Sequence, residues 1–267
     1  MKYDLTDVTF MVSIKIDSII RLENVLLSIR FLRKHFKCQI MVLEVDRHNN
    51  GILQRMLDGK VEYHFRKDCD TVFYRTKYQN EMAQMVVTPY LCIWDADIII
   101  APTQIMAVMD KLRNEECEFG IPYDGSTYGV PTSIKELFAV KQQIGLLHEQ
   151  RGKMHLRHGI PHSSCGGATF ANVDIYKKAG MENLAFYGWG AEDDERTERW
   201  RIMGYRIYWA DGVLYHLSHP RGMNSGYTRD GQLANAKMVA FATETSSVEE
   251  LRSYFDLQNN KNLNIDI

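Results

Sequence analysis

The chain has 267 residues, of which 45% are hydrophobic, and its formal net charge is -2 at pH 7. This length is enough for one large domain or two small ones with a hydrophobic core, and one mixed α/β domain is the default expectation. The charge is nearly balanced and no long Lys/Arg block occurs. The sequence therefore predicts no nucleic acid partner and no tight binding to acidic membrane surfaces.

The cysteines and the apolar segments predict the compartment. The five cysteines are scattered, odd in number and without a CxxC pair, which favours a reducing compartment and argues against a thiolate metal site. The N-terminal apolar run contains Ser13 and Lys15 and follows no basic segment, so it predicts a strand rather than a signal peptide. No apolar run approaches the roughly 18 to 20 residues of a membrane-spanning helix. We expect a soluble, cytoplasmic protein, for which peripheral membrane association stays open.

Strands and helices alternate in the first half of the chain. After the first β-rich run, Leu22, Val25, Leu26 and Ile29 repeat at helical spacing. Strands are expected at 8–16, 39–45, 61–65 and 90–94, and helices from residue 19, at 77–87 and from Pro102 to about Arg113. This alternation predicts an α/β fold with a mostly parallel central sheet flanked by helices.

The second half contains longer segments without periodicity. Glycines and prolines predict a long loop at 118–133, and the polar, basic stretch 151–164 is typical of a functional lid or a disordered connection. Helices are expected at 134–149, at 192–203 before Gly204 and from residue 232 onward, strands at 166–170 and 205–209, and a loop at 214–227.

Acidic residues follow two of the predicted strands. In a mostly parallel sheet the ligand crevice lies at the carboxyl ends of the strands, where Glu44, Asp46, Asp95 and Asp97 are placed. Asp95 and Asp97 are isolated charges in an apolar stretch, and such charges need a partner. Two carboxylates at this spacing can hold a divalent cation that bridges the oxygens of a diphosphate. A solvated strand end is the alternative interpretation.

Four consecutive carboxylates occupy 192–195, at the start of a predicted helix. One interpretation is a favourable interaction of these charges with the helix dipole. The other is a catalytic site, because four like charges in succession should raise at least one pKa, as suits a general base. Trp189 lies between Gly188 and Gly190 and can provide an aromatic platform for the apolar face of a sugar.

Two further groups of residues have both a structural and a functional interpretation. His216 and His219, three positions apart, are either structural or ligands for a manganese-type ion that also accepts carboxylate oxygen. The segment 73–77 combines aromatic rings with two cations before a helix, which suits base stacking and phosphate contact as well as a solvated helix start.

Together these residues resemble the GT-A glycosyltransferases, and above all the β-1,4-galactosyltransferases and bacterial family 2 enzymes of the chondroitin-polymerase kind. The carboxyl half carries the resemblance, in Cys165-Gly166-Gly167-Ala168-Thr169-Phe170 and in Tyr187-Gly188-Trp189-Gly190-Ala191-Glu192-Asp193-Asp194-Glu195. Upstream, Phe73-Tyr74-Arg75-Thr76-Lys77-Tyr78-Gln79-Asn80 is similar to a Phe-Asn-Arg-Ala-Lys-x-x-Asn segment, and Asp95-Ala96-Asp97 is similar to the family's metal motif.

The resemblance implies a role for each candidate residue. Asp97 would coordinate the metal with Asp95 assisting, and His216 or His219 would complete the metal shell. Asp193 would be the general base, with Glu192 beside it in the catalytic pocket. The residues expected to bind the nucleotide sugar are Ser13, Arg21, Glu44, Arg75, Asp95, Gly167, Trp189 and Gly190.

The activity implied is a metal-dependent, inverting transfer of a hexose from a UDP-sugar to a saccharide acceptor, as in polysaccharide biosynthesis. The metal would be Mn2+ or Mg2+, and the hexose of the galactose or the N-acetylgalactosamine or glucose type. Ser164 replaces the bulky aromatic residue of galactose-specific members, which leaves the donor sugar open. We expect a GT-A catalytic domain at 1–227, with a nucleotide and metal half at about 1–115 and an acceptor half at about 160–227, followed by a helical extension at 228–267.

Other activities also use paired carboxylates. A metal-dependent nucleotidyl- or phosphoryltransferase is one alternative, although no Walker-type loop is present. A glycosidase could use two carboxylates without a nucleotide. A carbohydrate-binding protein without catalysis is the non-enzymatic alternative.

Overall fold

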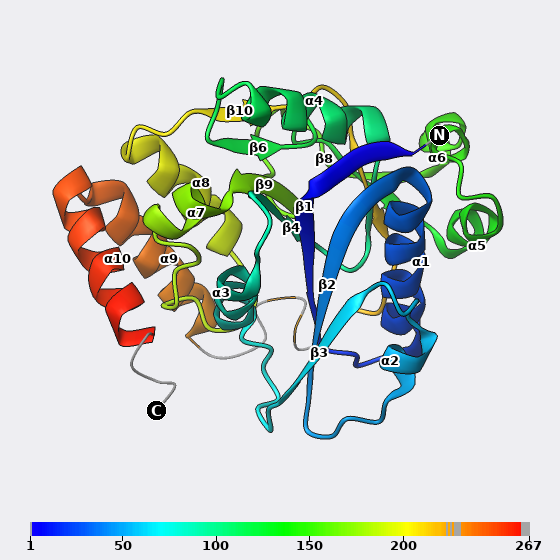
Figure 1. Ribbon diagram of the computed structural model, residues 1–267, viewed down its shortest axis with the longest axis horizontal. Coiled ribbons are helices and arrows are strands. Elements are labelled where there is room, and N and C mark those ends of the chain that lie inside the picture. Colours follow the sequence, from blue (N-terminus) through cyan, green and yellow to red (C-terminus); the bar gives the residue numbers. More distant parts are fainter. Residues whose placement is uncertain (1, 223, 225, 227–230, 263–267) are drawn as a thin grey trace.

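The computed structural model describes residues 2–222, 224, 226 and 231–262. Its largest element is a seven-stranded sheet with the order β10-β6-β9-β4-β1-β2-β3 (Figure 1). All pairs are parallel except those of β9, which runs antiparallel to β4 and β6. The strands are β1 (Tyr3–Ile14), β2 (Phe36–Asp46), β3 (Glu62–Lys67), β4 (Tyr90–Trp94), β6 (Phe119–Ile121), β9 (Ala168–Asn172) and β10 (Ile207–Trp209).

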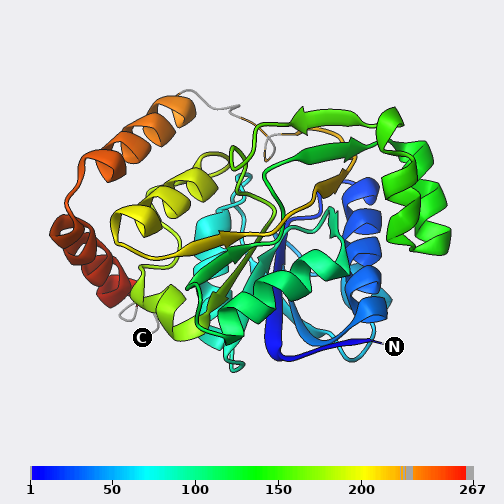
Figure 2. The ribbon, with the colours of Figure 1, turned by 90° about the horizontal axis from the view of Figure 1, so that it is seen from above.

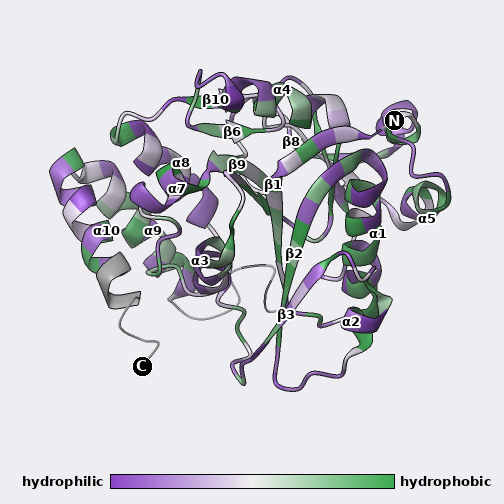
Figure 3. Ribbon diagram, in the orientation of Figure 1, coloured by the Kyte–Doolittle hydropathy of each residue, from purple (hydrophilic) through white to green (hydrophobic). Residues whose placement is uncertain are grey.

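Helices cover both faces of this sheet because its strands are apolar on both sides. Phe10 and Val12 of β1 pack with α1 and α4 in one core, whereas Met11 between them packs with α3, α7 and α8 in another. In Figure 3 hydrophobic residues colour most of β2 green. The helices are α1 (Ile19–His35), α2 (Ile52–Met56), α3 (Arg75–Met85), α4 (Pro102–Arg113), α7 (Val173–Lys178) and α8 (Glu192–Ile202).

A second, four-stranded sheet has the order β5-β11-β7-β8. β11 is antiparallel to β5 and parallel to β7, and a third core packs this sheet against α1, α5 and α6. The strands are β5 (Ile98–Ile100), β7 (Thr127–Val130), β8 (His155–His158) and β11 (Leu214–Leu217), and the helices are α5 (Thr132–Lys141), α6 (Ile144–Glu149) and a 3-10 turn, η1 (Arg151–Lys153).

The helical segment after residue 230 consists of α9 (Gln232–Thr245) and α10 (Val248–Asn262). Figures 1 and 2 both place these helices beside α8, at the end of the molecule opposite α5 and α6. The Thr243 hydroxyl donates a hydrogen bond to Glu195 of α8 (3.0 Å), which ties α9 to that helix. No helix of the described residues is long and apolar enough to cross a membrane. Residues 228–230 and 263–267 of the predicted extension lie outside the described part of the chain.

Four sequence predictions are wrong in detail. The loop expected at 118–133 contains β6 and β7, strands too short to show periodicity and held by pairing with distant segments. The helix expected at 134–149 is broken after α5, where Gln142 has a positive φ of 46°. The stretch 151–164 contains η1 and β8, and the loop expected from residue 214 begins with β11, so that His216 lies on a strand. Residues 223, 225 and 227 of that loop are outside the described set.

Candidate functional site

Asp97, His216 and His219 form a cluster that could hold a metal ion. One ligand atom of each residue lies within 4.8 Å of the others. The Nε2 atoms of His216 and His219 are 3.6 Å and 3.2 Å from the two carboxylate oxygens of Asp97. The backbone brings them together, because His216 pairs with Ile98 of β5 and the Leu217 N–H donates to the Asp97 carbonyl (2.7 Å). Both predicted histidines therefore reach the predicted aspartate.

The protonation of this cluster suits a metal. Burial lowers the pKa of His216 to about 4, so its imidazole is neutral at pH 7 and keeps a free lone pair. Burial alone would raise the pKa of Asp97, but the two histidines and Arg21 outweigh this effect and lower the pKa. One carboxylate with two imidazoles is a donor set that fits Mn2+ better than Mg2+, which prefers an all-oxygen shell.

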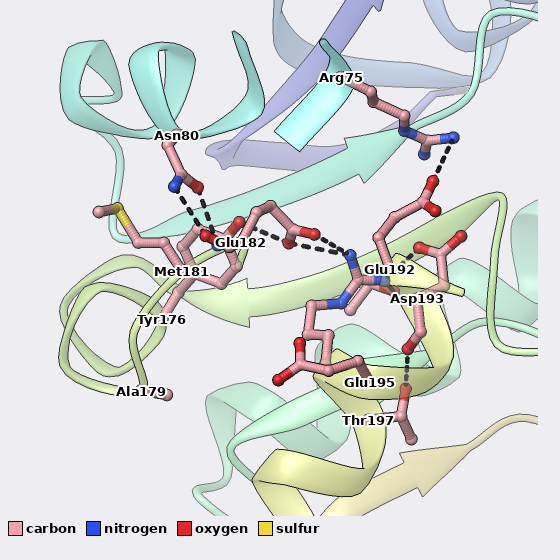
Figure 4. Close-up of polar contacts among 12 residues, drawn as sticks. Arg75, Asn80, Tyr176, Ala179, Met181, Glu182, Glu192, Asp193, Glu195 and Thr197 are labelled. Atoms are coloured by element: carbon pink, nitrogen blue, oxygen red, sulfur yellow. Dashed lines mark hydrogen bonds and ion pairs between the residues drawn. The ribbon is translucent and has the colours of Figure 1, made fainter. Parts of the chain in front are cut away.

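Beside the cluster, Arg75 at the start of α3 joins two acidic side chains. Its Nη2 atom is 2.5 Å from Asp95 Oδ1. Its Nη1 atom is 3.9 Å from Glu192 Oε1, as Figure 4 shows. Burial raises the pKa of Asp95 to about 6, although the Arg75 charge acts against this rise. Burial, together with the charge of Asp193, raises the pKa of Glu192 to about 7. Asp95 thus pairs with the arginine and is not among the three residues of the metal cluster.

The acidic run 192–195 opens α8, and its four carboxylates have different partners. The first turn of α8 has no side-chain N-cap, because the residue at the cap position is Ala191, whose side chain has no hydrogen-bond acceptor; its φ is 65°. The partners of the four carboxylates are, in chain order, the Gly190 N–H (2.8 Å), the Arg196 guanidinium (2.7 Å), the Cys165 thiol (3.2 Å) and the Arg199 guanidinium (3.0 Å). The run therefore divides between the site, where Glu192 and Asp193 lie, and the interior, where Glu195 is 2% exposed.

Asp193 is held by a buried chain of charges. Arg196 Nη1 lies 2.9 Å from both oxygens of Glu182, and its Nη2 donates to Asp193 Oδ1 (2.7 Å; Figure 4). The Tyr176 hydroxyl also donates to Glu182 (2.8 Å). Gly166 lies against the other Asp193 oxygen, because a Cβ at that position would be 2.6 Å from Oδ2. One oxygen is thus fixed by an arginine while the other faces a residue without a side chain.

This chain of charges also sets the ionisation of Asp193. Burial acts to raise its pKa, but Arg196 and Arg75 more than offset that effect, so the pKa of Asp193 is lowered and the group is ionised at pH 7. The raised pKa values in the run belong to Glu192 and, through burial, to Asp194. Like charges in succession do raise a pKa, as the sequence predicts, but the pKa of Asp193 is not the one raised.

Two adjoining cavities meet at these residues. The first has a volume of about 750 Å³ and contains the metal cluster with Ser13, Arg21 and Phe73 on its walls. The second, of about 1000 Å³, is lined by Asp193 and the glycines at 166, 167 and 190. The residues that line both are Arg75, Asp95, Trp189, Glu192, His216 and Arg221. The predicted metal and base centres therefore open into neighbouring spaces with a shared wall.

No family model and no curated protein matches the sequence. Solved structures do match. GalNAc-T7 with UDP, GalNAc and Mn2+ aligns with a TM-score of 0.60 at 11% identity, over 95% of this chain and 54% of that one. S. aureus TarS 1-349 with UDP-GlcNAc gives 0.58 at 11% identity, over 94% and 69%. The mannosyltransferase PcManGT from Pyrobaculum calidifontis, with GDP-Man and Mn2+, gives 0.53 at 15% identity, over 95% and 70%.

The chain has the GT-A glycosyltransferase fold. Identities of 11–15% support the fold alone, and the chain spans about half of the GalNAc-T7 structure. Within this GT-A fold, the turn between β4 and β5 carries Asp95 and Asp97, so both lie where strands of the two sheets meet. The expected mostly parallel sheet with flanking helices is confirmed, with β9 as its antiparallel strand.

The structure brings the predicted site residues of the GT-A chain together, except Glu44. The exposed fraction of Glu44 is 1%, and its carboxylate accepts a hydrogen bond from the Tyr63 hydroxyl (2.7 Å) while burial raises its pKa. It does not line either cavity. Trp189, in contrast, lines both and is 39% exposed. Glu44 thus links β2 to β3 and does not reach the space where the other predicted residues converge.

Sequence reasoning missed the pair that holds Asp193. Arg196 follows Asp193 at i,i+3 in a predicted helix, a spacing at which side chains meet. The sequence could therefore have predicted this partner. The sequence could not predict the contact of Glu182 with Arg196, because Glu182 lies in an irregular segment and is completely buried. Its position is fixed by Asn80 of α3, whose side chain exchanges two hydrogen bonds with the Glu182 backbone (2.8 and 2.9 Å).

Proposed function

We propose that the chain is a metal-dependent glycosyltransferase that moves a hexose from a UDP-sugar to a hydroxyl of a saccharide acceptor, with inversion at the anomeric carbon. The observation that carries the proposal is the pairing of two centres. A carboxylate and two imidazoles line one cavity, and an ionised aspartate lines the next. The bound nucleotide sugars and Mn2+ of the neighbouring structures support the same class of reaction.

In this mechanism the metal site is provided by Asp97, His216 and His219. A divalent ion bound there would supply positive charge to the diphosphate of the donor. Arg75, fixed by Asp95, is available to contact the nucleotide, and Phe73 lines the same cavity. Ser13 and Arg21 are proposed to contact the donor from β1 and α1.

Asp193 is proposed to accept the proton of the acceptor hydroxyl. The acceptor oxygen attacks the anomeric carbon as UDP departs. An ionised carboxylate is the form that a base requires, and Arg196 fixes its direction. Trp189 offers an apolar ring at the wall common to both cavities, where a sugar face can stack. Glu192, Gly167 and Gly190 would shape the space around the sugar.

The donor sugar is proposed to be of the galactose or the N-acetylgalactosamine or glucose type. Ser164 lines the second cavity and lies 3.2 Å from the Tyr123 hydroxyl, so this wall carries a small polar group. Residues 1–227 are proposed as the catalytic domain with α9 and α10 as an extension, and the five free cysteines fit a cytoplasmic setting.

The test is release of UDP in the presence of Mn2+, with four UDP-hexoses and a panel of saccharide acceptors. Asp193→Asn keeps the shape of the side chain, so UDP binding should persist while turnover falls by at least ~100-fold. Asp110→Asn, on the exposed surface of α4, is the matched control. Near-normal turnover of Asp193→Asn refutes the base assignment. Release of hexose 1-phosphate in place of UDP would identify nucleotidyl transfer, and absence of either product would indicate a binding protein.

A further inference from the structure

The basic segment at 151–164 has a defined position next to the metal cluster. Its strand β8 pairs with β7, and the register shifts between Thr127 and Tyr128, so that Arg157 lies at an irregularity of the ladder. The Arg157 stem crosses Gly129, since a Cβ at Gly129 would lie 3.5 Å from Arg157 Cδ. Gly129 in turn pairs with His216 of the parallel strand β11. Paired residues of neighbouring strands share a face, so Arg157 and the His216 ring lie on the same side of the small sheet.

No carboxylate of the described residues forms an ion pair with Arg157. Among the residues that the structure describes, its guanidinium forms no hydrogen bond or ion pair, although the side chain is half-buried. Burial and the charge of Arg221 lower the pKa of Arg157, and Asp97 only partly compensates. A half-desolvated guanidinium with five donors is stabilised by an oxyanion, which it can bind with two parallel hydrogen bonds.

The surrounding cavity determines which anion can reach Arg157. Arg157, His216 and Asp193 line the second cavity, and Arg221 lines both cavities. A donor whose nucleoside lies in the first cavity and whose sugar lies beside Asp193 must place its diphosphate between them, next to the metal cluster. The arginine is therefore near the end of the diphosphate that carries the sugar.

We propose that Arg157, together with Arg221, forms an oxyanion-binding site for the donor, and that the oxyanion is the sugar-bearing phosphate of the nucleoside diphosphate. This inference rests on the proposed function. In the reaction, the bond between the anomeric carbon and the phosphate oxygen breaks, and its electron pair remains on that oxygen. The bond from the acceptor oxygen to the anomeric carbon forms, and the acceptor proton passes to Asp193. The two arginines stabilise the charge that appears on the departing phosphate.

The test compares binding of UMP and UDP, each with Mn2+, by calorimetry of the whole chain. In Arg157→Gln the affinity for UDP should fall by about 10- to 100-fold, as expected for loss of a charged hydrogen-bond partner, whereas UMP affinity should stay unchanged because UMP lacks the second phosphate. Arg157→Lys keeps the charge and should recover part of the loss. Lys153→Gln, an exposed cation four positions upstream, is the matched control and should bind UDP as the unmodified chain does.

The oxyanion at Arg157 could come from the diphosphate or from a carboxylate on the donor sugar. A second comparison, of UDP-glucose with UDP-glucuronate, separates these two sources. If Arg157→Gln binds UDP, UDP-glucose and UDP-glucuronate with similarly reduced affinity, the result supports the phosphate as the oxyanion. A loss confined to UDP-glucuronate retains the oxyanion site but overturns the phosphate assignment in favour of a carboxylate on the donor sugar. Equal affinities of Arg157→Gln and the unmodified chain for all ligands overturn the site. Failure of the unmodified chain to bind UDP at all overturns the proposed function and this inference together.

Discussion

Replacing Glu192 with glutamine should remove a pH-dependent contribution to the stability of the protein. The Glu192 side chain is 4% exposed, and burial and the Asp193 charge raise its pKa from 4.5 to about 7. The unfolded chain keeps the ordinary value, so the folded protein binds an extra proton between these two pH values. The contribution is fully present below pH 4.5 and is lost as the pH rises through 7.

The size of this contribution follows from the two pKa values. A rise from 4.5 to about 7 corresponds to about 3 kcal/mol, at 1.36 kcal/mol per pKa unit. The glutamine side chain of the variant has no proton to lose in this range. Its amide oxygen can still accept the hydrogen bond from the Gly190 N–H that Glu192 Oε2 accepts at 2.8 Å. The conformation of the loop before α8 should therefore persist.

The measurement is urea unfolding of both proteins at several pH values between about 4.5 and 8. The free energy of unfolding of the unmodified chain, minus that of Glu192→Gln, should fall by about 3 kcal/mol over this range. Glu198→Gln, at a partly exposed position of the same helix, is the control, and its free energy of unfolding should follow that of the unmodified chain across the pH range. Parallel pH dependences of Glu192→Gln and the unmodified chain refute the reasoning, because they mean that Glu192 titrates alike in both states.

Three further substitutions test the architecture of the two centres. Gly166→Ala places a Cβ 2.6 Å from Asp193 Oδ2, so turnover should fall at least ~10-fold while calorimetric UDP binding is retained; unchanged turnover contradicts the close approach. Glu182→Gln leaves Arg196 buried with less opposing charge and should cost about 3–5 kcal/mol in urea unfolding, and a change below about 1 kcal/mol argues against this role. Asp97→Ala should abolish Mn2+-dependent UDP binding, and undiminished binding excludes the metal cluster.

The fold was predictable where a segment carries its own pattern. Residues 90–94 and 102–113 form β4 and α4 with the predicted bounds, because an apolar run and a proline at the first helical turn are local signals. The strands β6, β7 and β8 have three or four residues each. Runs this short have no readable period, and only their pairing with strands from distant parts of the chain stabilises them.

The site was also predictable where it depends on local sequence patterns, and not where it depends on contacts between distant segments. The motifs at 95–97 and 192–195 mark the two centres because isolated or consecutive charges are visible in the sequence. The sequence does not show which carboxylate holds its proton, since that depends on burial and on arginines such as Arg75, which comes from another helix. Nor does it separate Glu44 from the strand-end acids that line the site, because the contact with Tyr63 forms only in the folded sheet.

The pairing of β11 with β5 also has a consequence for folding. The histidines of β11 and the segment after it meet an aspartate about 120 residues earlier in the chain. Such a distant contact forms only after the entropy of closing a long loop has been overcome, which places assembly of the metal cluster late in folding. An ion that binds only the assembled cluster stabilises the native state over the unfolded chain. If Mn2+ binds there, it should therefore also slow global unfolding, and its affinity should report whether the two sheets have joined.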